Sequence, residues 1–190
     1  MKPHFIALAA LAAASLIAFA QPVSQLPAPW LLSGESPGRY TAGVDQDGHQ
    51  SGTKDAKFLR YASGGTGSWA TLMQQFSAEN YRGKRIRFDA EVMTHDTGGA
   101  ALWMRVDSKR SYATSFYNSS DKVIYGTVNW ERRSVVLDVD ADATVISLGV
   151  IGYGGGESWL RNMHVEEVGK DVPVDVMPNA AAAMRKEPSL

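Results

Sequence analysis

Residues 85–93 read RIRFDAEVM, and this stretch decides the fold class. Apolar side chains occupy its even positions from Ile86 to Val92, whereas Arg87, Asp89, Glu91 and Met93 occupy the odd ones. This period of two is that of a β-strand with one face toward a core and the other toward solvent.

Similar segments recur on both sides of this stretch, separated by Gly, Asn, Asp and Ser. No segment shows a sustained 3.6-residue stripe. Strands are predicted near residues 40–44, 56–61, 68–76, 85–94, 100–106, 112–117, 130–139, 145–152 and 158–168. Short strands at this spacing are typical of an all-β antiparallel sandwich or barrel.

The chain divides into four predicted parts. Residues 1–20 carry an early Lys2, an apolar run and an Ala18-Phe19-Ala20 cleavage motif. They predict a signal peptide rather than a membrane anchor, because the uncharged stretch is short for a span. Residues 21–38 are a predicted extended lead-in, 39–169 the single domain, and 170–190 a flexible tail. We therefore expect an exported protein, periplasmic or extracellular, with no membrane insertion after cleavage.

Composition excludes several function classes. The formal net charge is -1 without basic runs, which argues against nucleic-acid binding. The chain has no cysteine, so an exported form must be stable without disulfides. The stretch SGGTGS lacks the ending of a phosphate loop. No cofactor is expected.

Three stretches resemble the jelly-roll domains of the galactose-binding-like superfamily. They are residues 70–94, 100–108 and 126–168, which include YRGKRIRF, NWERRSVVLDV and WLRNMHVEE. The superfamily includes carbohydrate-binding modules of secreted hydrolases, and the likeness is greatest to a bacterial domain of uncertain role. The resemblance implies a jelly-roll sandwich. Arg161 stands where such domains usually carry an Asp that holds neighbouring loops in place or binds a structural cation. No metal is therefore expected there.

The carboxylates offer a catalytic alternative. Asp89 and Glu91 share one strand face about 7 Å apart, a separation that suits glycoside hydrolysis. Arg87 shares that face, which favours cross-strand ion pairs instead. Asp138, Asp140 and Asp142 begin like a calcium loop but lack its later Gly and Glu, so no metal is predicted.

The outward face of residues 98–108 is the leading candidate for a ligand site. Trp103 offers an aromatic plane for a sugar ring, and Arg105, Glu91 and Gln75 offer polar groups for its hydroxyls. Tyr153, at the end of its strand, adds a second plane. The competing interpretation is that Trp103 packs beneath a loop, with Arg105 paired to Glu91.

Three functions remain open at this point. The first is a non-catalytic binding module for carbohydrate around Trp103 and Arg105. The second is an accessory domain that binds a protein partner and has no sugar affinity, for which a flat apolar patch is expected. The third is a glycoside hydrolase built on Asp89 and Glu91, which needs a deep cleft and a carboxyl with a raised pKa.

Overall fold

The computed structural model describes residues 26–64 and 67–178, and within them the fold is all-β, as predicted. The predicted signal peptide lies outside these residues. The elements are β1 (Leu31–Gly34), η1 (Pro37–Arg39), β2 (Tyr40–Asp45), β3 (Ala56–Tyr61), β4 (Trp69–Ser77), η2 (Glu79–Tyr81), β5 (Arg85–Ser108), β6 (Ser115–Tyr117), β7 (Ile124–Asp138), β8 (Ala143–Tyr153) and β9 (Glu157–Val168).

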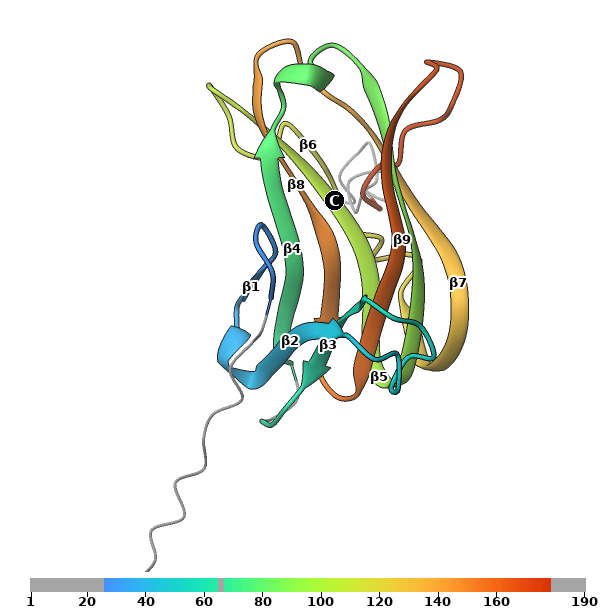
Figure 1. Ribbon diagram of the computed structural model, residues 1–190. Helices are drawn as coiled ribbons and strands as arrows, with labels where there is room; N and C mark the ends of the chain where they lie inside the picture. The colour runs from blue at the N-terminus through green and yellow to red at the C-terminus, as the bar shows by residue number, and fades with distance from the viewer. Residues whose placement is uncertain (1–25, 65–66, 179–190) are drawn as a thin grey trace, which may run out of the picture.

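The strands form two facing layers that are continuous through β5 (Figure 1). One layer, the β8 sheet, has the order β1-β4-β8 followed by residues 100–108 of β5 and then β6. The other, the β9 sheet, has the order β2-β3-β9 followed by residues 85–95 of β5 and then β7. All pairings are antiparallel.

Strand β5 crosses from one sheet to the other between its two halves. Its register with β7 shifts three times between Val92 and Ala100, as expected where bulges bend a strand. The turn from β8 to β9 crosses beside it, and Gly98 N donates to Gly155 O at 2.9 Å. A Cβ on Gly156 would lie 2.3 Å from the carbonyl of Asp96, so only glycine fits where these two crossings touch.

The core lies between the sheets and is lined by the even positions of β5. Phe88 and Val92 meet Leu102 and Val106 in one buried cluster that also takes in Leu148 from β8. The predicted inward face of residues 85–93 is therefore correct. The odd positions of residues 85–93 and 101–107 point away from this core, and the two halves of β5 consequently present opposite outer faces of the sandwich.

Three segments differ from the prediction. The predicted strands 85–94 and 100–106 are one strand, β5. The predicted lead-in contains β1, which pairs with β4 from Leu31↔Met73 to Gly34↔Ala70. The predicted tail is held to the sheet over residues 170–178: Asp175 N donates to Val136 O, and Met177 packs against the core. Residues 179–190 lie outside the described chain.

Candidate functional site

A groove of about 360 Å³ opens on the outer face of the β8 sheet. We call it the Trp103 groove. Its lining residues are Ser33, Gly34, Glu35, Trp69, Thr71, Met73, Trp103, Arg105, Tyr112, Phe116 and Ile151. Four of them are aromatic, and they come from β4, β5, β6 and the loop between β5 and β6.

Trp103 forms the floor of this groove. Its register partner on β8 is Gly149, yet its Nε1 donates to Thr71 Oγ1 on β4 at 2.7 Å. The indole therefore crosses over β8 at a position without a side chain. Thr71 Oγ1 in turn donates to Val150 O at 2.9 Å. These contacts fix the ring plane, and only 4% of Trp103 is exposed.

Arg105 forms one wall and is held in place by its neighbours. Its Nε and Nη2 each donate to Asp107 Oδ2, at 3.1 and 3.0 Å. Its guanidinium carbon lies 4.0 Å from the centre of the Tyr112 ring and 6.0 Å from that of Trp103. Such cation–π stacking orders the exposed Tyr112 ring over the groove. Asp107 balances the charge of Arg105 inside the site.

Four of the five predicted ligand-binding residues lie on this face. Gln75 and Arg105 share the register partner Ser147, and Gln75 Nε2 donates to Ser147 Oγ at 3.1 Å. Tyr153 packs against the cluster of Met73, Trp103 and Ile151. Burial raises the pKa of Tyr153 above its usual range.

Glu91 lies elsewhere, and its expected proximity to Trp103 is corrected. It is on the half of β5 that belongs to the β9 sheet, so it faces the opposite side of the sandwich. It accepts from Arg161 Nε at 2.7 Å and from Asn162 Nδ2 at 3.1 Å. The alternative pairing of Arg105 with Glu91 is likewise not observed, since Arg105 pairs with Asp107.

Asp89 and Glu91 belong to a ladder of ion pairs on that outer face. Asp89 is only 3% exposed and accepts from Arg87 Nε at 3.1 Å and Arg132 Nε at 3.2 Å. The hydrogen bonds from Asn162 and Arg161 lower the pKa of Glu91. A general acid needs the opposite shift. The geometry is that of cross-strand pairs that stabilise the sheet.

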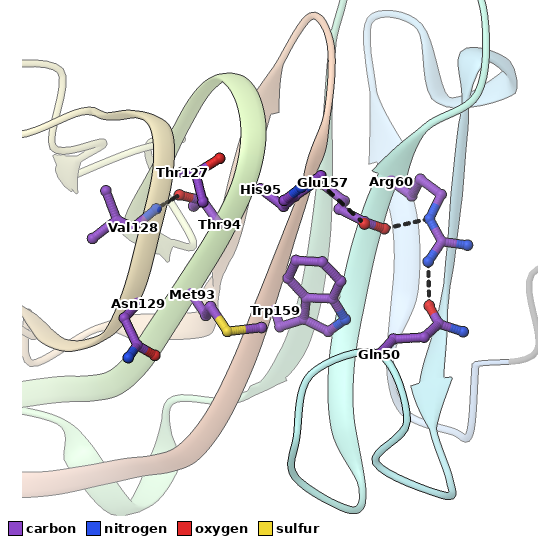
Figure 2. A pocket seen from close by; sticks show the side chains of 10 residues that line it. All are labelled: Gln50, Arg60, Met93, Thr94, His95, Thr127, Val128, Asn129, Glu157 and Trp159. Carbon is purple, nitrogen blue, oxygen red and sulfur yellow. Dashed lines mark hydrogen bonds and ion pairs between the residues drawn. The ribbon is translucent and has the colours of Figure 1, made fainter.

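A second groove, of about 560 Å³, lies on the outer face of the β9 sheet (Figure 2). We call it the Trp159 groove. Its lining residues are Gln50, Arg60, Met93, Thr94, His95, Thr127, Val128, Asn129, Glu157 and Trp159. Trp159 is not among the residues predicted from the sequence to bind a ligand. The outward alternation of Glu157 and Trp159 beside Met93 and His95 is the signal that could have revealed this site.

The polar side of the Trp159 groove is an interlinked group of side chains. Arg60 Nε donates to Glu157 Oε2 and its Nη2 donates to Gln50 Oε1. His95 Nδ1 lies 4.0 Å from Glu157 Oε1. Figure 2 shows the Trp159 indole beneath this group, with its nitrogen on the side of Gln50. Trp159 is 2% exposed, and its buried Nε1 has no hydrogen-bond partner.

Solved structures similar to this chain are mostly sugar-binding proteins. The CBM22-1–GH10 modules of Clostridium thermocellum xylanase 10B, complexed with xylohexaose, match with a TM-score of 0.56 at 12% identity, over 77% of this chain and 27% of that one. TmCBM61, in complex with β-1,4-galactotriose, matches with a TM-score of 0.51 at 12% identity, over 74% and 90%. The chain has the jelly-roll fold of these modules.

A third solved structure is a putative sugar-binding protein from Bacteroides thetaiotaomicron, with a TM-score of 0.52 at 13% identity over 73% of this chain and 87% of that one. The resemblance to galactose-binding-like jelly-roll domains is thus confirmed for the fold. These identities are too low to carry residue roles.

One curated protein is similar in sequence. It is an uncharacterized HTH-type transcriptional regulator, YbfP, of Bacillus subtilis (strain 168), 38% identical over 145 residues. The match takes in 76% of this chain but only 49% of the regulator, so the chain spans about half the length of that relative. No protein-family model matches the sequence.

Within the described ranges, no group of three or more His, Asp or Glu side chains is arranged to hold a metal ion. In that same part of the chain, no helix is long and apolar enough to cross a membrane.

Proposed function

We propose that this protein is an exported, non-catalytic carbohydrate-binding module and that the Trp103 groove is its binding site. The observation that carries the proposal is the set of four aromatic rings around one hollow on an outer sheet face. Aromatic planes cover the apolar faces of a sugar ring, and the fixed polar groups of a pocket set its orientation.

The roles within the groove follow from exposure and order. Tyr112 is 70% exposed and stacks on Arg105, so its ring is available to a ligand. Trp103 closes the floor and supports this arrangement rather than presenting a free face. Arg105 and Glu35 can hydrogen-bond to sugar hydroxyls at the rim. The bound sugars of the similar modules support the ligand class, and residues 1–20 support export.

A glycan-array screen of the purified protein tests the proposal. The informative variant is Tyr112→Ala, because this exposed side chain is removed without opening the core. Tyr125→Ala is the matched control, since Tyr125 is 68% exposed and does not line the groove. Tyr112→Ala is expected to weaken binding about tenfold, a loss of about 1.4 kcal/mol, and Tyr125→Ala to leave it unchanged.

A folded wild-type protein that binds no glycan on the array would overturn the proposal. Equal affinities of the wild type and Tyr112→Ala would exclude this groove. Capture of a defined protein partner without any sugar affinity would favour the accessory-domain interpretation. Fractionation of the producing cells tests export, which predicts that the protein is found outside the cytoplasm without residues 1–20.

A further inference from the structure

We infer that the Trp159 groove is a second carbohydrate-binding site, so that one molecule holds two sugar chains on opposite faces. The inference takes its ligand class from the proposed function but rests on different residues.

The first step is the unpartnered donor of Trp159. A buried N–H group without an acceptor is rare in proteins, and each case calls for an explanation. Trp159 Nε1 is buried, has no partner, and belongs to a side chain that lines a cavity of about 560 Å³. Trp103, in the other groove, has its Nε1 bonded to Thr71. The Trp159 groove therefore holds an unsatisfied donor, which an oxygen of a ligand can reach once the exposed Gln50 side chain beside the indole nitrogen moves aside.

The second step is the charge balance of the groove. The guanidinium of Arg60 is paired with the carboxylate of Glu157 and is also bonded to Gln50 (Figure 2). The two charges cancel, so this pair does not select an anion or a cation. Its remaining polar groups include the exposed amide of Asn129, which both donates and accepts. Neutral hydroxyl groups, which also do both, match this set.

The third step is the apolar surface beside these groups. Met93 and Val128 line the same groove as the Trp159 indole. Apolar side chains next to convergent hydrogen-bonding groups are the usual make-up of a small-molecule site. A pyranose ring has apolar faces and a hydroxyl rim, and it fits this division.

The fourth step is the placement of the two grooves. Met93 and Trp159 are register partners in the β9 sheet, whereas Trp103 pairs with Gly149 in the β8 sheet. All of these side chains point away from the core that separates the sheets. The two grooves therefore open in opposite directions, and each can be occupied without blocking the other. A protein with this arrangement links two polysaccharide chains.

Isothermal titration calorimetry with xylohexaose and with β-1,4-galactotriose tests the inference. Trp159→Phe removes the unpartnered N–H and keeps an aromatic ring. Trp130→Phe is the matched control, because Trp130 lies on the same sheet but does not line the groove. Circular dichroism checks each fold. If Trp159→Phe does not fold, Asn129→Ala takes its place, since Asn129 is exposed.

The expected result is two bound oligosaccharides per wild-type molecule, one for Trp159→Phe and two for Trp130→Phe. The wild type should also cross-link and precipitate soluble xylan if xylohexaose is bound, whereas Trp159→Phe should bind xylan without precipitating it. One bound ligand in both the wild type and Trp159→Phe overturns the second site and leaves the proposed function intact. If the wild type and Trp130→Phe each bind one ligand and Trp159→Phe binds none, the Trp103 groove is not a binding site. This result overturns both the proposed role of the Trp103 groove and the two-site inference. No binding to either sugar overturns the inference for these ligands, and a silent glycan array overturns the proposed function as well.

Discussion

Replacing Gly149 with alanine should destabilise the fold strongly, because β4 passes too close for a side chain. A Cβ built on Gly149 lies 2.1 Å from Leu72 O and 2.8 Å from the Cα of Met73. The first distance is more than 1 Å shorter than an ordinary contact. Both atoms are backbone in the adjacent strand, so no side-chain rotation relieves the overlap. Overpacking typically costs 1–3 kcal/mol, and we expect about 3 kcal/mol here.

For a domain of this size each kcal/mol lowers the melting temperature by about 2–4 °C. Gly149→Ala should therefore melt about 9 °C below the wild type, as measured by circular dichroism during heating. Gly155→Ala is the control: the nearest atom to its Cβ is Asp96 O at 3.9 Å, an ordinary contact, and its melting temperature should not fall. If Gly149→Ala melts at the same temperature as the control, β4 and β8 are not packed as closely as described.

Two further substitutions probe the framework. Tyr40→Phe removes a buried hydroxyl that accepts from Gly154 N at 2.9 Å and donates to nearby carbonyls. The free energy of unfolding, measured in urea, should fall by about 1–2 kcal/mol. An unchanged denaturation midpoint would contradict this. Hydrogen bonds from Arg85 and Lys170 lower the pKa of Asp138 to about 2. Its stabilisation is thus present above about pH 4 and lost as the pH falls through 2. Because Asp138 is 43% exposed, Asp138→Asn should cost only about 1 kcal/mol at pH 7, and this difference should be absent below pH 2.

The strands themselves were predictable because alternation is a local property of the sequence. Residues 56–61 were predicted with the observed bounds, and the inward face of residues 85–93 was correct. Strand β1 was missed because LLSG is short and lies between Pro and Gly residues. Its pairing with β4 depends on contacts some forty residues away, which no local pattern reports.

The predicted grouping of the site residues was wrong where it depended on which sheet each half of β5 joins. Glu91 and Trp103 both occupy outward positions on β5, and alternation alone treats such positions as equivalent. The crossing near Gly98 turns one half of the strand into the other sheet, so the two side chains face opposite directions. The Trp159 groove was missed for the same reason, because its residues come from β3, β5, β7, β9 and the loop between β2 and β3, and they meet only in the folded sheet.

The crossing of β5 also bears on how the molecule is held together during folding. The chain has no cysteine, so no disulfide joins the layers. Instead the chain itself passes between the two sheets several times, and β5 and the β8–β9 segment make two of these crossings side by side at one end of the sandwich. Neither sheet is complete without the other. The pairing of β5 with β9 joins Arg85 to Val168, which lie almost half the chain apart in sequence. Such distant pairings make folding slow, of the order of milliseconds to seconds, and we expect the two layers to form and unfold as a single cooperative unit.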